Sequence, residues 1–201
     1  MTSFDLIAFD LGNVLTLVDE AKGAERIAAL AGCSFDTASE VVFAAERKIP
    51  LETGRQTWQA FVNDVRARLD APLPEDEFRE IFESVLTPNK AIFPLVFRVL
   101  ASHRVALCSN TSEPHWRLES NRLPFAGQFD PTVVSYQAGV MKPDRRIYEV
   151  LVERAAVRAN RVLFIDDRAE NVAGAIAAGL HAVQFTSVAK LEEDLRRFGV
   201  L

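Results

Sequence analysis

The stretch VLFIDDRAENVAGAIAAGLHAVQF, residues 162–185, decides the fold class of this 201-residue chain. Its first four residues, Val162–Ile165, form a short apolar run that is typical of a buried strand. A helical pattern follows over Glu170–Ala178 and ends before a glycine, a residue that favours helix C-termini. A second apolar run, Ala182–Phe185, completes a strand–helix–strand unit and predicts a parallel sheet.

Three further apolar runs extend this pattern, and another helical pattern begins near Pro143. Strands that alternate with helices place helices on both faces of a parallel sheet. We therefore predict an α/β fold with a Rossmann-like three-layer core. The three further runs are Phe4–Phe9, Val105–Cys108 and Thr132–Ser135.

Residues 16–89 have a different character. They contain no convincing strand, and glycines and prolines separate their amphipathic helical segments. We predict a helical insertion at 16–89 within a core of residues 1–15 and 90–201, and we expect Phe35, Phe43, Trp58 and Phe61 to form the insertion's own core. The helical segments are Ala24–Ala31, Asp36–Arg47, Gln56–Leu69 and Glu75–Leu86.

Composition and charge exclude several classes of protein. The chain is 49% hydrophobic and 25% charged, which is ordinary globular usage, and its net charge is −5. An acidic chain of this kind suits neither nucleic acid nor an anionic membrane surface. The first residues lack a basic segment, and no apolar run has the length of a membrane span. We expect a soluble cytoplasmic protein, and the sequence leaves its oligomeric state open.

Polar residues follow several of the predicted strands directly. Asp10 follows the first run, Ser109 and Asn110 follow the second, and Asp166 and Asp167 follow Ile165. Ligands of open parallel sheets bind at the carboxyl ends of the strands, so these side chains are expected to converge. Taken singly, each of these residues is also of a type that is common in ordinary turns.

Four phrases carry a family resemblance: FDLGNVL (9–15), LCSNTSEPHW (107–116), GVMKPDRRIYEVL (139–151) and FIDDRAENVAGAIAAGL (164–180). In this order they resemble the four motifs of the haloacid dehalogenase-like (HAD) hydrolase superfamily. Within the superfamily, the chain resembles subfamily IA, whose members carry a helical cap. It is most similar to the bacterial sugar phosphatases that include alpha-D-glucose-1-phosphate phosphatase. The segment LETGRQTWQAF (51–61) resembles a recurring cap segment.

The resemblance implies a Mg²⁺-dependent phosphomonoester hydrolase that acts on a small phosphorylated metabolite, a sugar phosphate foremost. Asp10 would be the nucleophile, which forms an aspartyl-phosphate. The implied magnesium ligands are Asp10, the backbone carbonyl of Gly12, Asp167, and Asp166 either directly or through water. Oxygen ligands of this kind suit Mg²⁺.

The resemblance also assigns the phosphate contacts. Ser109 and the following backbone N–H groups would hold the phosphoryl oxygens, with Asn110 in support, and Lys142 would neutralise charge on the nucleophile and the phosphoryl group. Three aspartates and one lysine leave the site negative, so a divalent cation would be needed before a phosphate dianion could bind.

Gly12 departs from the family pattern, because most HAD phosphatases carry a general acid–base aspartate at this position. Its loss can cost about 10²–10⁴ in rate. Either the leaving group is acidic enough to need little help, as in a sugar 1-phosphate, or another residue substitutes. His115 and Asp19 are the candidate substitutes, although each also fits an ordinary surface position.

Two other functions stay open. A 2-haloacid dehalogenase resembles the same fold and uses an aspartate without a metal, but the Asp166–Asp167 pair favours a phosphatase. A weakly catalytic protein that binds or senses a phosphorylated ligand would also fit Gly12.

In the insertion, Glu52, Gly54 and Arg55 form either a turn that faces the site or a solvated turn.

Overall fold

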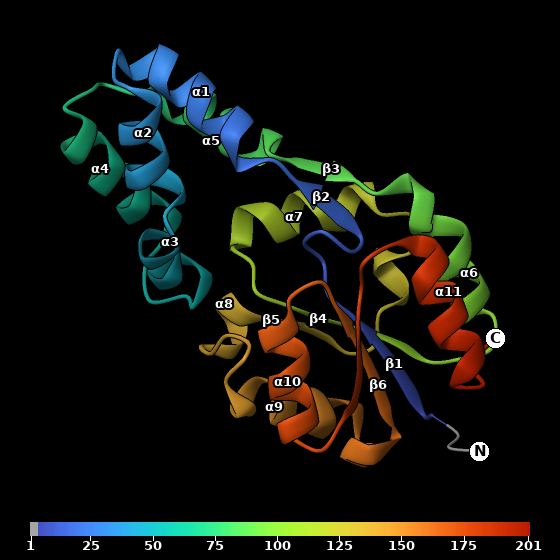
Figure 1. Cartoon of the computed structure of the whole chain (residues 1–201). Coiled ribbons are helices and arrows are strands. Elements are labelled where there is room, and N and C mark those ends of the chain that lie inside the picture. Colours follow the sequence, from blue (N-terminus) through green and yellow to red (C-terminus); the bar gives the residue numbers. More distant parts are fainter. Residues whose placement is uncertain (1–3) are drawn as a thin grey trace.

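Five parallel strands form the main sheet, in the order β5-β4-β1-β6-β7 (Figure 1). The computed structural model describes residues 4–201, so residues 1–3 of the predicted core lie outside the described residues. The central strand β1 pairs with β4 on one side and β6 on the other. This sheet confirms the predicted Rossmann-like α/β class. The strands are β1 (Leu6–Phe9), β4 (Val105–Ser109), β5 (Thr132–Val134), β6 (Val162–Asp166) and β7 (His181–Gln184).

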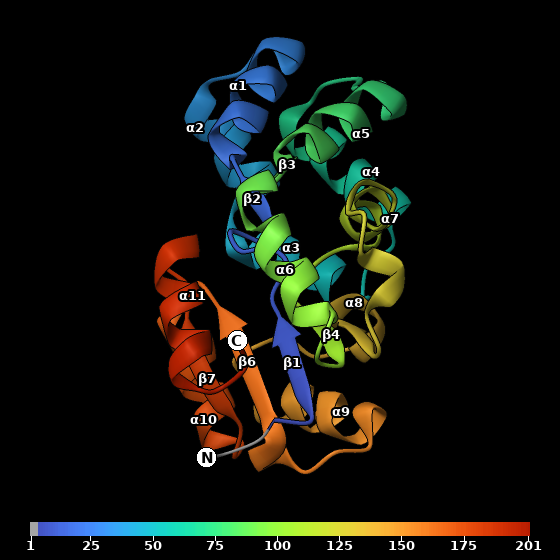
Figure 2. The ribbon, with the colours of Figure 1, turned by 90° about the vertical axis from the view of Figure 1, so that its right-hand side faces the viewer.

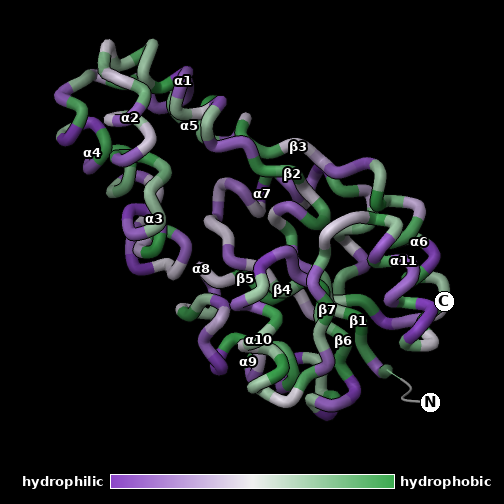
Figure 3. The backbone as a smooth tube through the Cα atoms, viewed as in Figure 1, coloured by the Kyte–Doolittle hydropathy of each residue, from purple (hydrophilic) through white to green (hydrophobic). Residues whose placement is uncertain are grey.

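Helices cover both faces of the sheet because successive side chains of a strand point to opposite faces. Ile7 and Phe9 belong to the cluster on the α6 and α11 face, whereas Leu6 and Ala8 belong to the cluster on the α9 and α10 face. The tube in Figure 3 is mainly hydrophobic along β1 and β4, as expected of strands buried on both sides. These helices are α6 (Phe93–Leu100), α9 (Arg145–Ala155), α10 (Ala169–Ala177) and α11 (Val188–Arg197).

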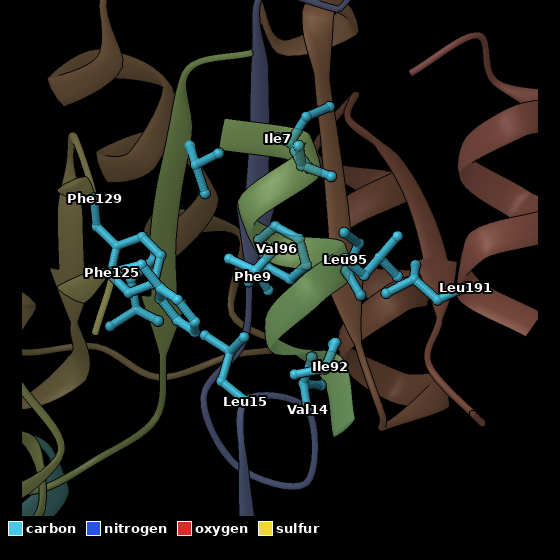
Figure 4. Packing of buried hydrophobic residues seen from close by; sticks show 14 of the residues in the cluster. Ile7, Phe9, Val14, Leu15, Ile92, Leu95, Val96, Phe125, Phe129 and Leu191 are labelled. Atoms are coloured by element: carbon cyan, nitrogen blue, oxygen red, sulfur yellow. The ribbon is translucent and has the colours of Figure 1, made fainter. Parts of the chain in front are cut away.

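Tight packing fixes the carboxyl end of β1. Figure 4 shows Phe9 of β1 beside Val96 and Leu95 of α6, with Leu15 from the following loop in the same cluster. All four side chains are buried. Asp10 comes directly after Phe9, so this packing determines where its carboxylate emerges from the sheet.

The chain between β2 (Thr16–Val18) and β3 (Leu86–Pro88) builds a separate helical unit, which lies beyond the strand ends of the main sheet (Figures 1 and 2). Its buried side chains form their own cluster. The helices of this unit are α1 (Glu20–Ala31), α2 (Phe35–Ala38), the π-helical segment η1 (Ser39–Phe43), α3 (Ala45–Glu52), α4 (Trp58–Leu69) and α5 (Glu75–Ser84).

A two-stranded ribbon joins the helical unit to the core, and it corrects the expectation that residues 16–89 contain no strand. β2 (Thr16–Val18) pairs antiparallel with β3 (Leu86–Pro88). Three-residue strands give almost no alternation pattern, and Pro88 argues against a strand in the sequence. The ribbon lies at the predicted junctions, while the division into domains stays a prediction.

The remaining helices are short or lie at the rim of the sheet. α7 contacts both α5 and β3, and α8 contacts α3, so these two helices of the core meet the helical unit and its ribbon. The elements are η2 (Lys90–Ile92), α7 (Glu113–Arg122), η3 (Ala126–Gln128), α8 (Ser135–Ala138) and η4 (Ala159–Arg161).

Two details of the helical unit differ from the sequence interpretation. Phe43, Trp58 and Phe61 are buried as expected, but Phe35 is 43% exposed. Phe35 is the first residue of the one-turn helix α2, where its side chain faces away from the unit's cluster. The predicted helix Asp36–Arg47 also breaks at Ala44, whose extended backbone (ψ 139°) lets α3 start in a new direction.

Among residues 4–201, no single helix is long and apolar enough to cross a membrane. One bent pair, Glu20–Ala31 with Phe35–Glu52, meets the length and composition criteria together, with a bend of 111°. The apolar side chains of this pair that lie inside the helical unit include Ala24, Ile27 and Phe43.

We predict that Phe61→Ala lowers the free energy of unfolding by about 3–5 kcal/mol, because it empties a buried aromatic site. Phe61 is 1% exposed, and its ring lies 5.6 Å from that of Phe82. Phe35→Ala is the matched control, and a change within about 0.5 kcal/mol is expected at that exposed position. Urea denaturation measures both values, and similar losses in the two variants would contradict the burial described above.

Candidate active site

Two neighbouring strands bring three carboxylates together. Asp10 follows β1, and its backbone N–H donates to Ile165 O of β6 at 2.9 Å. Asp166 ends β6, and Asp167 follows it. One oxygen from each of the three carboxylates lies within 4.8 Å of the others. The parallel pairing of β1 with β6 therefore produces the cluster that the sequence predicts at the strand ends.

Lys142 brings a buried ammonium into this cluster. Its Nζ lies 2.7 Å from Asp10 Oδ1 and 2.6 Å from Asp166 Oδ2, and the residue is 4% exposed. Asn110 fixes the lysine backbone from both sides: its Oδ1 accepts from Lys142 N at 2.8 Å, and its Nδ2 donates to Lys142 O at 2.9 Å. Asn110 thus positions the lysine, and its predicted contact with phosphate stays a prediction.

Asp166 is held by the loop and helix that follow β6, and Asp167 is held by the loop that follows β1. Asp166 Oδ1 accepts from Arg168 N at 2.9 Å and from Asn171 Nδ2 at 2.9 Å. Asn171 is buried, so it braces the loop. Asp167 is less buried and accepts one side-chain hydrogen bond, from Asn13 Nδ2 at 3.2 Å. The role of Asn13 was missed in the sequence, where only its place within FDLGN could have indicated it.

The electrostatics of the cluster favour an added cation. Burial and the neighbouring Asp166 charge raise the pKa of Asp10 to about 7, against the opposing effect of Lys142. Burial also raises the pKa of Asp167. For Lys142, burial acts to lower the pKa, yet the Asp10 and Asp166 charges outweigh it and the net shift is upward. With all four groups ionised the formal charge is −2, and a divalent cation would offset it.

The donor set fits a hard divalent metal ion. Carboxylate oxygens are the ligands that such ions prefer, and three of them converge here. Gly12 lines the same cavity, so its backbone lies beside the cluster. The cluster can therefore hold a metal ion.

Ser109 lies at the end of β4, as the sequence indicates, and its contact with phosphate stays a prediction. It is fully buried at the end of β4, and its Oγ donates to Asn110 O at 3.3 Å, while the cavity is lined by Asn110 and Thr111. Thr111 is held by Ser135, whose Oγ accepts from Thr111 N at 2.9 Å and donates to Thr111 O at 3.1 Å. The sequence pattern missed Thr111, because the strand end alone did not reveal which side chain faces the cavity.

A cavity of about 380 Å³ lies between the cluster and the helical unit. A site of this size suits a small metabolite. The core contributes Asp10, Asn110, Lys142 and Asp167, together with Arg168. The helical unit and its ribbon contribute Val18, Glu20, Ala45, Lys48, Ile49, Glu52 and Leu86.

The two candidate substitutes for the absent acid lie in different surroundings. His115 lines the cavity, but its ring stacks on Phe82 at 4.2 Å between centroids, and its Nε2 lies 2.9 Å from Phe82 O. Burial lowers the pKa of His115 to about 4, so the ring is neutral near pH 7. Asp19 is the N-cap of α1, where it accepts from Lys22 N at 3.1 Å, and the cavity lining does not include it.

Residues at the turn after α3 line two different cavities. Glu52 faces the cavity that holds the carboxylate cluster, whereas Arg55 lines a second cavity of about 430 Å³ on the same seam. Gly54 (φ +67°) docks against α8: a Cβ at this position would lie 2.3 Å from Tyr136 O. The turn therefore faces the core, and a side chain at position 54 would push it away.

The sequence matches a known family of hydrolases. The family model described as haloacid dehalogenase-like hydrolase matches residues 4–179. Pyrimidine 5'-nucleotidase YjjG of Escherichia coli (strain K12) is 23% identical over 193 residues, which cover 88% of this chain and 84% of the nucleotidase. Other relatives are longer: the chain spans 6% of the length of mouse acyl-CoA dehydrogenase family member 10, at 33% identity over 69 residues, or 32% of this chain.

Solved structures show the same fold. A HAD family enzyme of Bacteroides thetaiotaomicron, in complex with magnesium and inorganic phosphate, has a TM-score of 0.82 at 21% identity and covers 90% of this chain and 94% of its own. L-2-haloacid dehalogenase from Xanthobacter autotrophicus, with chloropropionic acid covalently bound, has a TM-score of 0.67 at 18% identity, covering 98% of this chain and 84% of its own.

We predict that Gly174→Ala destabilises the protein, although alanine ordinarily stabilises a helix by about 1 kcal/mol relative to glycine. Gly174 lies in α10, and a Cβ there would lie 2.7 Å from Pro143 O, next to Lys142. Gly127→Ala is the control, since nothing lies within 4 Å of its added Cβ. Thermal denaturation should show a lower Tm for Gly174→Ala only. A higher Tm would mean that the Lys142–Pro143 loop does not depend on this close approach.

Proposed function

Because this chain belongs to the haloacid dehalogenase-like hydrolase family, we propose that it is a Mg²⁺-dependent phosphatase of small phosphorylated metabolites, sugar phosphates foremost. The observation that carries the proposal is the buried Lys142 ammonium between Asp10 and Asp166, beside Asp167. Such a cluster pairs a nucleophile with charges that can hold a phosphoryl group.

Asp10 is the proposed nucleophile. Its Oδ1 accepts hydrogen bonds from Leu11 N and lies against Lys142 Nζ, both at 2.7 Å. Its Oδ2 has no hydrogen-bond partner among the described residues, which supports Oδ2 as the oxygen that attacks phosphorus. Attack forms an aspartyl-phosphate on Asp10, and water then releases inorganic phosphate. The buried lysine offsets part of the charge that this step concentrates.

Mg²⁺ would be held by Asp10, the Gly12 carbonyl and Asp167, and it would supply the charge that the acidic cluster lacks. Both oxygens of Asp166 already accept hydrogen bonds, from Asn171, Arg168 N and Lys142. An indirect role of Asp166, through water, therefore fits better than direct ligation. The magnesium complex of the Bacteroides enzyme supports the choice of metal.

Gly12 leaves the site without a general acid–base side chain at this position. Its backbone is not in the left-handed region, and a Cβ would meet only Val18 Cγ2, at an ordinary 3.6 Å. Neither backbone strain nor crowding therefore requires a glycine here. Its presence favours a substrate whose leaving oxygen departs easily, such as the anomeric oxygen of a sugar 1-phosphate, or a proton donor elsewhere in the cavity.

The dehalogenase alternative fits the cluster less well. A 2-haloacid is itself a carboxylate, and it would enter a cavity where three carboxylates face one ammonium. The likeness to L-2-haloacid dehalogenase is one of fold. A protein that only binds a phosphorylated ligand would retain affinity without turnover.

We predict that Asp10→Asn abolishes Mg²⁺-dependent release of phosphate from a panel of sugar phosphates, to less than about one thousandth of the starting rate, because the amide is a poor nucleophile. EDTA should abolish the activity, and added Mg²⁺ should restore it. Asp70→Asn, at an exposed position, is the control purified in parallel to exclude contaminating phosphatases. Inorganic phosphate release measures the activity.

Two outcomes would overturn this function. Chloride release from 2-chloropropionate that is insensitive to EDTA, without phosphate release, would identify a dehalogenase. Binding of phosphate esters without turnover in the presence of Mg²⁺ would identify a binding protein.

A further inference from the structure

We propose that Glu52, on the helical unit, is the general acid and base of this reaction and does the work for which Gly12 has no side chain. This inference rests on the proposed phosphatase function and adds to it the residue that moves the proton. No other carboxylate from the helical unit lines the cavity without an ion-pair partner.

One face of α3 forms the wall of the cavity opposite the carboxylate cluster. The α3 residues that line it are Ala45, Lys48, Ile49 and Glu52, which recur at the spacing of a single helix face. Asp10 and Asp167 line the same cavity of about 380 Å³ from the core. A substrate whose phosphoryl group lies at Asp10 therefore occupies a cavity that this face of α3 also lines.

Glu52 is the free carboxyl group of that wall. Glu20, the other acid of the helical unit that lines the cavity, forms an ion pair with Lys48. Among the residues that the structure describes, Glu52 makes no hydrogen bond and no ion pair through its side chain. It is partly buried and lies at the end of α3. A carboxyl group in this position is available to a ligand.

The surroundings of Glu52 allow it to hold a proton. Burial raises its pKa, and the charge of Glu20 acts in the same direction. The positive charges that face it, Lys48 on α3 and Arg168 on the core, act in the opposite direction without reversing the shift. General acids with pKa values raised in this way are common in active sites.

The other proton carriers of the cavity are less suited. His115 is neutral, and its Nε2 is committed to Phe82 O. Glu170 is exposed and accepts from Arg168 Nε at 2.6 Å, and its pKa is lowered. Asp19 caps α1 outside the cavity lining. Glu52 is the remaining candidate.

Close docking of the turn fixes the depth at which Glu52 enters the cavity. Thr53 Oγ1 donates to Ile49 O at 2.6 Å and accepts from Arg55 Nε at 2.9 Å, which closes the end of α3. Gly54 then lies against the backbone of Tyr136 with no room for a Cβ. Gly54 is thus a positioning residue for Glu52.

Glu52 would give up one proton and take one back in each hydrolysis of a phosphate monoester. An Asp10 oxygen bonds to phosphorus as the bond from phosphorus to the leaving oxygen breaks, and the Glu52 carboxyl proton moves to that oxygen, which leaves as an alcohol. A water then attacks the same phosphorus while its proton moves to the Glu52 carboxylate. The bond from phosphorus to Asp10 breaks, and inorganic phosphate leaves with Glu52 protonated again.

The test compares Glu52→Gln with the starting protein on an alkyl phosphate and on p-nitrophenyl phosphate, both with Mg²⁺. Glutamine cannot donate a proton as an acid, so kcat/KM for the alkyl ester should fall by about 10²–10⁴. The value for the aryl ester should change by less than about threefold, since p-nitrophenolate leaves without a proton. A burst of about one equivalent of p-nitrophenol per enzyme should appear, because hydrolysis of the aspartyl-phosphate is slowed.

Matched variants separate catalysis from structure. Glu46→Gln is the control, since Glu46 lies on the same helix, is exposed and does not line the cavity. Gly54→Ala, which changes no titratable group, should reproduce the selective loss on the alkyl ester. Gly12→Asp in the Glu52→Gln background should restore hydrolysis of the alkyl ester, because position 12 accepts a Cβ.

Equal losses on both esters in a folded Glu52→Gln protein, or no loss on either, would overturn the assignment of Glu52. A starting protein that hydrolyses neither ester with Mg²⁺ would instead overturn the proposed phosphatase function, so the two failures are distinguishable.

Discussion

A single buried ammonium, that of Lys142, is the feature on which the rest of the site depends. Removing a charged group from water costs several kcal/mol unless its partners are held in place. Here the partners are Asp10 and Asp166, at 2.7 and 2.6 Å. The surrounding structure supports this contact from each direction: Asn110 holds the lysine backbone, Asn171 holds Asp166, and Gly174 allows the loop of Lys142 to approach α10. The ion pair is therefore held in place by the fold around it.

Much of the core could be predicted from the sequence, because a parallel sheet constrains where residues go. Apolar runs marked the five main strands, and residues at the carboxyl ends of two adjacent strands, Asp10 and Asp166, had to meet at one edge. The ribbon β2–β3 escaped because three residues carry no periodic signal. Ser109 illustrates a further limit: its place at a strand end was evident, but its full burial and its hydrogen bond to Asn110 O could not be derived from the pattern.

The way the helical unit docks on the core could not be predicted from the sequence. Its helices and most of its aromatic core followed from amphipathic spacing, yet which of its faces meets the core depends on docking between two separately packed clusters. The sequence left open whether the turn at Glu52 faces the site, and nothing in it indicated Lys48. Both residues line the cavity because α3 starts in a new direction after Ala44 and contacts α8.

The antiparallel ribbon has a consequence for the size that the helical unit can take. Because Val18 pairs with Leu86, the two ends of the helical unit leave the ribbon one strand spacing apart. The helical unit takes the place of the loop in a hairpin formed by β2 and β3. Doubling the length of a loop costs only about 0.6 kcal/mol in closure entropy. The helical unit can therefore be lengthened or shortened at little cost in closure entropy while the pairing of β2 with β3 stays the same.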